Sequence, residues 1–301
     1  EVTVSNNTMT ACSGTAIHVD DAASSSLIID NTIQNSGTAI EIQGCSPLIQ
    51  DNTLTSNSGY PFRQVGQAYP SYSGNVLTGN ALKVISVQGT ITANTTWQNV
   101  QGLNMPFLVT GDISVNNGVT LTIQPGVVVK FQYTSDGYQT RRMLVYGTLA
   151  AEGTSGSPIV FTSERDDAHG GDSNGDGGGT TPDNGNWAHV RIMNTGAATI
   201  EYCQFWYGGF RHPGEHQMLW IDNAAAQITV RNCEFHRAYS RALRYSVNTY
   251  GIDAAIIENV FANCNDGILI DGNALATATV LNNTMSSCGG TAIYIDGNGS
   301  T

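Results

Sequence analysis

Alternating acidic and amide side chains between Asp172 and Asp183 could bind a metal ion. The segment Asp172-Ser-Asn174-Gly-Asp176-Gly places oxygen donors at every second position, and Asp183 follows at the spacing of the last ligand of a calcium loop. Calcium takes about six to eight oxygen ligands, and glycine permits the turn that gathers them. We therefore predict a structural Ca²⁺ bound by Asp172, Asn174, Asp176 and Asp183. The alternative is a Gly/Asp-rich loop closed by its own Asx turns.

Aromatic and basic residues are concentrated between positions 206 and 250, and they form a candidate ligand or partner face. Its members are Trp206, Tyr207, Trp220, Arg237, Tyr239, Arg241, Arg244 and Tyr245. Such residues stack on sugar rings and bond hydroxyl or carboxylate groups. They are equally typical of contacts between proteins. A third interpretation is an outward aromatic ladder that packs on itself.

Two patterns in the sequence could belong to a catalytic site. The string His212-Pro-Gly-Glu215-His216 matches a metallopeptidase motif, but that motif needs a helix, and Pro-Gly in a loop forbids one. A polysaccharide lyase or glycoside hydrolase needs carboxylates that converge with a base or with each other. The acidic candidates Asp166, Asp167, Asp172 and Asp176 all belong to one loop. The sequence shows no convergent active site, although it leaves open whether the protein is an enzyme.

A recurring asparagine between short apolar triplets indicates the elements that must position these residues. The asparagines are Asn7, Asn31, Asn52, Asn75, Asn232, Asn259 and Asn283. Their spacings of 24, 21 and 23 residues, and later of 27 and 24, are typical of a β-solenoid in which each coil stacks on the next. Asparagine tolerates left-handed backbone angles at a corner, and its amide can bond the equivalent asparagine one coil away. We therefore predict a structural asparagine ladder.

Composition and alternation favour one continuous solenoid over residues 1–301. The chain has 34 glycines, and segments such as Thr38–Ile42 alternate inward Ile or Val with outward polar residues. Residues 60–73, 163–186 and 208–217 are expected to be projecting loops, with the possible calcium loop at 163–186. The net charge of −12 argues against a nucleic-acid partner. No apolar run has the roughly 18 residues of a membrane span.

Six cysteines show no CxxC spacing, which makes a zinc ribbon or a redox pair a poor fit. Cys203 and Cys233 follow equivalent turn positions, and Cys264 and Cys288 lie five residues beyond such positions. Each pair should therefore stack on neighbouring coils. Both disulfides and stacked buried thiols are compatible with this placement.

The middle of the chain resembles a known family. Residues 109–131 (VTGDISVNNGVTLTIQPGVVVKF), followed by MLVYGTLAA at 143–151 and IVFTS at 159–163, are similar to the bacterial right-handed parallel β-helix repeat family of secreted and cell-surface proteins, the pectate-lyase-like solenoids. The resemblance implies an all-β fold, a single right-handed parallel β-helix of about a dozen coils with projecting loops. It also implies export to the cell surface or the medium, but no single activity.

The two ends of the chain are alike. Residues 4–20 and 280–296 share eleven identities in seventeen ungapped positions, at an offset of 276. An uncapped solenoid end can pair with another strand. We therefore expect a structural repeat unit of an extracellular fibre or adhesin, with copies of itself as end-to-end partners and calcium as a stiffening ion. The alternative is a carbohydrate-active enzyme or carbohydrate-binding β-helix with a polysaccharide as its partner.

Overall fold

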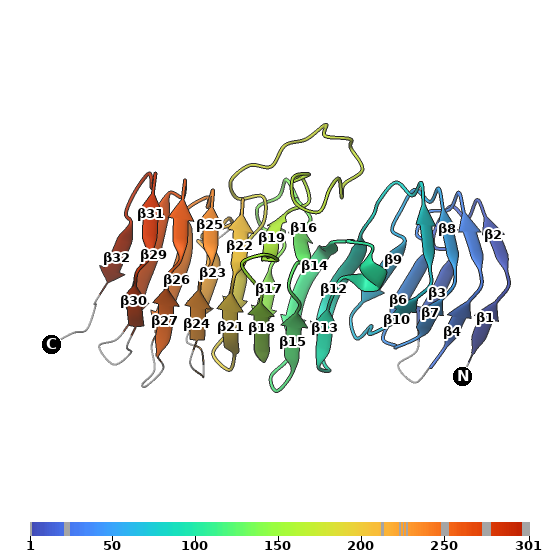
Figure 1. Cartoon of the computed structure of the whole chain (residues 1–301), viewed down its shortest axis with the longest axis horizontal. Helices are drawn as coiled ribbons and strands as arrows, with labels where there is room; N and C mark the ends of the chain where they lie inside the picture. The colour runs from blue at the N-terminus through green and yellow to red at the C-terminus, as the bar shows by residue number, and fades with distance from the viewer. Residues whose placement is uncertain are drawn as a thin grey trace.

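The chain folds as a single parallel β-solenoid of about 11 turns (Figure 1). The computed structural model describes residues 2–20, 25–211, 214–222, 224, 226, 228–247, 253–272 and 278–296. Every pairing between its named strands is parallel, and each strand pairs with strands one coil away. The expected all-β parallel solenoid is therefore confirmed.

Three sheets form the N-terminal part. Sheet A contains β1 (Thr3–Ser5), β4 (Leu27–Ile29), β7 (Leu48–Gln50) and β10 (Ser71–Ser73). Sheet B contains β2 (Thr8–Thr10), β5 (Thr32–Gln34), β8 (Thr53–Thr55) and β11 (Val76–Thr78). Sheet C contains β3 (Ile17–Asp20), β6 (Ile40–Gln43), β9 (Phe62–Val65) and the first half of β12 (Ile85–Ile91).

Three further sheets form the C-terminal part. Sheet D contains β13 (Thr95–Trp97), β15 (Thr120–Ile123), β18 (Thr148–Glu152), β21 (Ala197–Glu201), β24 (Ile228–Arg231), β27 (Ala254–Ile257) and β30 (Ala278–Leu281). Sheet E contains β16 (Val128–Phe131), β19 (Ile159–Ser163), β22 (Cys203–Trp206), β25 (Glu234–His236), β28 (Val260–Ala262) and β31 (Thr284–Ser286). Sheet F contains β17 (Met143–Val145), β20 (Val190–Ile192), β23 (Gln217–Asp222), β26 (Arg241–Val247), β29 (Asp266–Gly272) and β32 (Ile293–Asp296).

The two parts meet at an irregular junction. Sheet C continues into sheet E, because β12 pairs with β9 and β14 (Phe107–Val115) pairs with both β12 and β16. The second half of β12 pairs with the second half of β14, which in turn pairs with β17, so sheet F begins at the second half of β12. Sheet B ends at β11, and the next coil has the 3-10 helix η1 (Val100–Gly102) instead of a strand. One sheet is therefore lost and another is gained at the junction.

Parallel register stacks similar residues inside the solenoid. Phe161, Phe205, Phe235 and Phe261 occupy one inward column of sheet E and are fully buried. Their neighbouring ring centroids are 4.8–4.9 Å apart and the rings lie within 9° of parallel. The spacing between strands thus matches the distance at which rings stack. Burial of each such side chain contributes about 1.5–3 kcal/mol.

The asparagine side chains form a ladder between neighbouring coils. Nδ2 of Asn7, Asn31 and Asn52 donates to Oδ1 of the next asparagine, ending at Asn75, at 3.0–3.1 Å. Nδ2 of Asn52 also donates to the carbonyl of Ile28 at 2.8 Å. The ladder therefore satisfies buried backbone groups as well as its own amides.

The left-handed corner lies one residue before the ladder position, which differs from the sequence-based expectation. Asp30, Asp51 and Glu258 have φ values of 55°, 53° and 59°, and each directly precedes a ladder asparagine. Asn232 has φ 54° and so occupies the corner itself. Cys233 takes the ladder position, where its backbone N–H donates to Oδ1 of Asn259 at 2.9 Å. Asn259 then bonds Asn283 at 3.0 Å.

A second polar ladder was missed from the sequence. The backbone N–H of Cys12 donates to Oγ of Ser36, and that of Ser36 donates to Oδ1 of Asn57. Asn57 in turn donates from Nδ2 to Oδ1 of Asn80 at 2.9 Å. Each of these residues lies five positions after a member of the first ladder. This constant offset was the signal that could have revealed it.

All six cysteines are free thiols in this structure. Sγ of Cys203 donates to the carbonyl of Ala151 at 3.3 Å, and Sγ of Cys233 donates to the carbonyl of Ile200 at 3.4 Å. Burial raises the pKa of the Cys203 thiol well above its ordinary value. Of the two alternatives left open by the sequence, Cys203 and Cys233 are stacked buried thiols, whereas Cys288 of the second pair is partly exposed.

Two of the three expected loops match the structure. Residues 164–189 connect β19 to β20, and a shorter connection of residues 207–216 joins β22 to β23. The expectation of a loop over residues 60–73 was wrong, because β9 and β10 both lie there. The segment lacks the GTAI-type pattern, and the inward positions of its strands are held by Phe62 and Tyr72 instead of Ile or Val.

We predict that Asn52→Ala lowers the free energy of unfolding by about 3 kcal/mol. The substitution removes an amide that is completely buried and leaves Asn31, Asn75 and the Ile28 carbonyl without this partner. Urea unfolding followed by circular dichroism measures the change. The control is Asn7→Ala at the exposed end of the ladder, which should cost under about 1 kcal/mol. Equal losses in the two variants would contradict a buried ladder that stabilises the fold.

Candidate functional site

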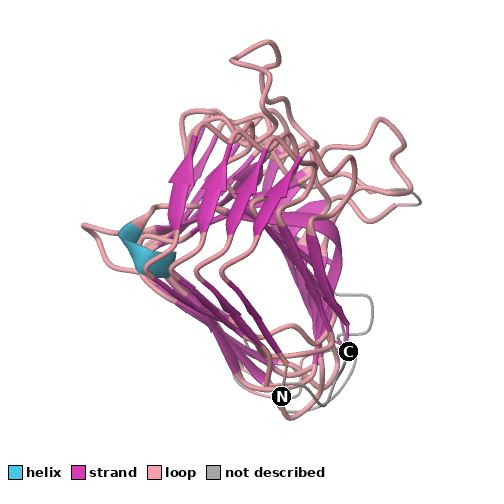
Figure 2. Cartoon of the chain, turned by 90° about the vertical axis from the view of Figure 1, so that its right-hand side faces the viewer, coloured by secondary structure: helices cyan, strands magenta, loops and turns pink. Residues whose placement is uncertain are grey.

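The 164–189 loop projects from the solenoid (Figures 1 and 2). The ammonium group of Lys130 on β16 donates to the carbonyl oxygens of Asp166 and Gly171, at 2.8 and 2.5 Å. Oδ2 of Asp166 accepts hydrogen bonds from Thr162 and lies 2.7 Å from Nδ1 of His169. These contacts attach the base of the loop to the sheet.

Lys130 is the least expected member of this group. Its side chain is completely buried, and burial lowers its pKa to about 8, although nearby carboxylates act in the opposite direction. Burial alone would raise the pKa of Asp166, but hydrogen bonds from His169 and Thr162 hold it below its ordinary value. The sequence signal was a lysine inside the apolar run VVVKF, in a chain with only two lysines.

The predicted calcium residues lie in the exposed part of the same loop. The Asp172 carboxylate accepts the backbone N–H groups of Gly175 and Gly177 at 2.7 and 2.8 Å. Asp176 accepts from Gly178 and Gly179 through Oδ1, and from Thr180 through Oδ2. These are Asx-type turns, the alternative considered for this sequence.

Asp183 forms hydrogen bonds with residues close to it in the sequence. No described hydrogen bond joins it to the other three predicted ligands. Its Oδ1 accepts from the N–H of Asn184, and its own N–H donates to Asn186. Across the described ranges, no group of three or more His, Cys, Asp or Glu residues is placed to hold a metal ion. Calcium binding by Asp172, Asn174, Asp176 and Asp183 stays a prediction.

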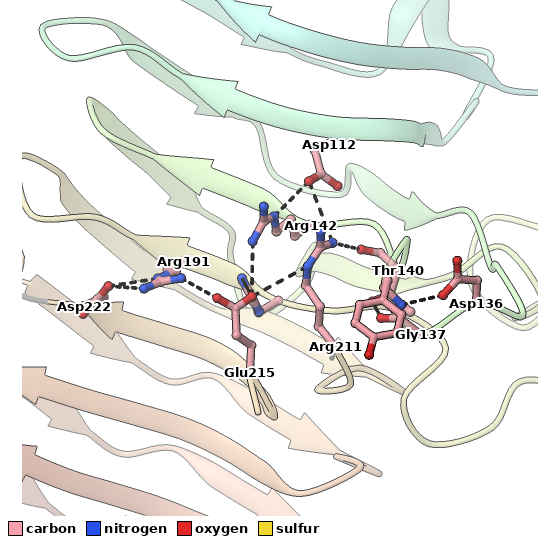
Figure 3. Close-up of polar contacts among 11 residues, drawn as sticks. Asp112, Asp136, Gly137, Thr140, Arg142, Arg191, Arg211, Glu215 and Asp222 are labelled. Atoms are coloured by element: carbon pink, nitrogen blue, oxygen red, sulfur yellow. Dashed lines mark hydrogen bonds and ion pairs between the residues drawn. The ribbon is translucent and has the colours of Figure 1, made fainter. Parts of the chain in front are cut away.

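A network of three arginines and three carboxylates crosses the outer surface of the solenoid (Figure 3). Glu215 lies at its centre, in the connection between β22 and β23, and accepts from Arg142 at 3.2 Å and Arg191 at 2.9 Å. Nε of Arg211 lies 3.7 Å from the same carboxylate. We call Asp112, Arg142, Arg191, Arg211, Glu215 and Asp222 the arginine–carboxylate network.

The edges of the network are also paired. Arg142 bonds Asp112 at 2.8 Å, and Arg191 bonds Asp222 through Nε and Nη2 at 2.9 and 2.5 Å. Arg211 donates to the carbonyl of Thr140 at 2.6 Å. The formal charges of the six side chains cancel. The network therefore joins four separate chain segments to one another, and each of its carboxylates already contacts at least one arginine.

His189 lies beneath this network and is completely buried. Burial, together with the positive charges of Arg142, Arg191 and Arg211, lowers the pKa of its imidazole well below the ordinary value. The ring packs edge-on against Trp220, with centroids 5.9 Å apart. A neutral histidine is thus part of the packing under the network.

The predicted aromatic and basic face does not form one surface. Trp206 on sheet E stacks on His236, with centroids 3.8 Å apart. Trp220 on sheet F lies between the guanidinium groups of Arg191 and Arg244, at 3.5 and 4.8 Å, and is only 8% exposed. In the described contacts, both tryptophans therefore pack against side chains of the same chain.

The other members of the predicted face are distributed in the same way. Tyr207 and Arg237 follow strands of sheet E, whereas Arg241 lies on sheet F. Tyr239 is exposed and packs against Phe210, with centroids 4.7 Å apart. The assignment of Tyr245 to this face was wrong, because it occupies an inward position.

Tyr245 lies in register with Ile221 and Ile270. It is 1% exposed, and burial raises its pKa to about 12. Alternation along β26 directs it inward, next to the outward Arg244. The sequence-based list included Tyr245 without applying this alternation.

We predict that the contribution of Lys130 to stability increases between about pH 8 and pH 10.5. The pKa of Lys130 in the folded protein lies near 8, below its ordinary value of 10.5, so the unfolded chain binds more protons in this interval. The free energy of unfolding of the wild type, minus that of Lys130→Met, should therefore rise with pH. Urea unfolding of both proteins at several pH values measures the difference. A difference that stays constant from about pH 7 to about pH 10 would contradict the lowered pKa.

We predict that Glu215→Gln loosens the connection between β22 and β23. The variant removes the negative charge that three arginines share and should cost about 1–2 kcal/mol. Hydrogen exchange of the amides of residues 209–211 and 214–216 should become roughly tenfold faster. The matched control is Glu201→Gln, which breaks a more exposed pair with Arg231. If exchange in the connection is the same in both variants, Glu215 does not hold it.

Two family models match the chain. The model described as pectate-lyase like beta helix domain matches residues 89–215, and the model described as periplasmic copper-binding protein (NosD) matches residues 1–108. No curated protein and no solved structure matches significantly. Within the described residues, no helix has the length and apolarity needed to span a bilayer. The matches support a periplasmic or extracellular location. The chain is thus a parallel β-solenoid in which residues 89–215 are similar to the pectate-lyase like beta helix domain and residues 1–108 to the periplasmic family.

Proposed function

We propose that the chain is a structural β-solenoid unit of a fibre or cell-surface adhesin outside the cytoplasm. In this proposal, β30, β31 and β32 of one unit pair with β1, β2 and β3 of the next. The next unit is either a second copy or a further stretch of the same polypeptide. A calcium ion in the 164–189 loop would stiffen the unit and belongs to the same proposal.

The observation that carries the proposal is the apolar surface of the last described coil. Ile293 and Ile295 are 41% and 69% exposed. Ile293 is in register with Ile268, which is 1% exposed one coil earlier. These side chains continue the inward columns of the solenoid, and one further coil would bury them.

The backbone at both ends supports the same arrangement. Among the described residues, β1, β2 and β3 pair only with strands of the second coil, and β30, β31 and β32 only with strands of the preceding one. A row of unpaired N–H and C=O groups is a template for another strand. Residues 4–20 and 280–296 are alike in sequence. A coil that stacks on one end of the unit therefore has a residue pattern that can also stack on the other end.

A carbohydrate-active enzyme is the competing function, and the arginine–carboxylate network is where its chemistry would be sought. Hydrolysis or elimination needs a carboxylate or base that is free to exchange a proton with the substrate. Glu215 and Asp222 are instead bonded to arginines at 2.5–3.2 Å. This pairing favours a role in holding the loop, and so favours the structural function.

We predict that the purified chain forms linear oligomers as its concentration rises, and that Ile295→Asp prevents this. A carboxylate at this position would lie within the joined core, where an unpaired charge is costly. Sedimentation velocity and negative-stain electron microscopy measure the assembly. The control is Val76→Asp, an exposed aliphatic residue on β11, 53% exposed and far from both end coils; it should assemble like the wild type. A wild-type chain that stays monomeric, or an Ile295→Asp variant that assembles normally, would refute end-to-end pairing.

A further inference from the structure

A cavity opens in the wall of the solenoid where its two parts meet. Strand β10 is the last strand of sheet A and β13 is the first strand of sheet D, and in the described structure these two strands do not pair with each other. Gln101 connects the two coils at one corner, where its Nε2 donates to the carbonyl of Asn75 at 3.0 Å. Beside this contact lies a cavity of about 220 Å³.

The cavity has aromatic walls and a polar rim. Tyr69, Tyr72 and Trp97 provide the rings, and Gln64, Thr96 and Gln98 provide amide and hydroxyl groups. None of the side chains that line it carries a charge, although the chain has a net charge of −12. A ligand of this cavity must therefore be polar and neutral, because an ionised group would lose its hydration without gaining a counter-charge.

The rings are held in place before any ligand binds. Oη of Tyr69 accepts the backbone N–H groups of Thr92 and Ala93 at 2.7 and 3.1 Å. Oη of Tyr72 accepts from Nε2 of Gln64 at 2.9 Å, and burial raises the pKa of this tyrosine so that its hydroxyl stays neutral. A rigid aromatic pocket loses little conformational entropy on binding.

Trp97 completes the wall. It lies on β13, the first strand of the coil that follows β10. Its ring stacks on Phe107 with centroids 4.8 Å apart and an angle of 7°. Only 4% of Trp97 is exposed, so it forms the floor of the cavity, while Thr96 and Gln98 on either side are exposed at the rim. Aromatic floors with amide and hydroxyl rims suit molecules that have apolar faces and polar edges.

We propose that this cavity binds one or two rings of a neutral sugar. Sugar rings present C–H faces to aromatic side chains and hydroxyl groups to amides, and their hydroxyls can both donate to and accept from the unpaired backbone edges of β10 and β13. The volume is below the roughly 300–1,000 Å³ typical of sites for drug-sized ligands, which limits the ligand to a short saccharide. An added strand of polypeptide would use the same backbone edges, but it would need more space.

The cavity lies near the end of the first family match. The match to the periplasmic family ends at residue 108, and the match to the β-helix domain begins at residue 89. The residues that line the cavity, between 64 and 107, all lie within the first match, and those from Thr95 onward lie in the overlap. This proposal does not depend on end-to-end assembly, because both end coils are several turns away.

Isothermal titration calorimetry on the whole chain tests the proposal. The probes are short oligosaccharides of glucose, mannose and galactose, with a uronic acid oligosaccharide of the same length as the charged comparison. We expect at least one neutral probe to bind and the uronic acid probe to bind at least tenfold more weakly. If no neutral probe binds, or if the charged probe binds as tightly, the proposal is wrong.

Two variants locate the site. Gln98→Ala removes an exposed amide at the rim, and Tyr72→Phe removes one hydroxyl; each should weaken binding of the neutral probe about five- to tenfold. The matched control is Gln124→Ala, an exposed glutamine one coil further on that does not line the cavity and should bind normally. Circular dichroism shows that each variant is folded. Unchanged binding in folded Gln98→Ala and Tyr72→Phe would overturn the assignment of the site.

Discussion

Backbone pairing between neighbouring coils is the interaction on which the rest of this structure depends. Each short strand has its hydrogen-bond partners one coil away, so no coil can satisfy its own backbone. The parallel register then fixes which side chains meet, and equivalent residues come to lie about 4.8 Å apart. Phenylalanine rings, asparagine amides and thiols form columns for this one reason.

The register also determines where charge can be tolerated. Lys130 points away from the core, yet it is buried because a loop closes over it and supplies two carbonyl oxygens. Arg191 lies on the outer side of sheet F and is compensated by Glu215 from a loop and by Asp222 from the next coil. Both loops thus return to the solenoid through charged contacts, while the stacked strands are held by backbone hydrogen bonds and apolar packing.

The fold could be predicted from the sequence because its signals repeat. The spacing of asparagines such as Asn31 and Asn52, and the alternation in segments such as Thr38–Ile42, report local geometry that every coil shares. The contacts among Asp112, Arg142 and Glu215 could not be predicted, since Glu215 lies 73 residues from Arg142 and its reach depends on the path of a loop. Tyr245, by contrast, could have been placed correctly, because alternation along β26 puts it in register with Ile221 and Ile270.

The unpaired boundary between β10 and β13 has a mechanical consequence. Elsewhere along the axis, three sheets share a load that pulls the ends of the rod apart. At this boundary only the pairing of β12 with β14 continues among the described strands, helped by single contacts such as those of Gln101 and Tyr69. Tension along the rod would therefore concentrate at this boundary. The two parts of the solenoid would separate there before either part unfolded.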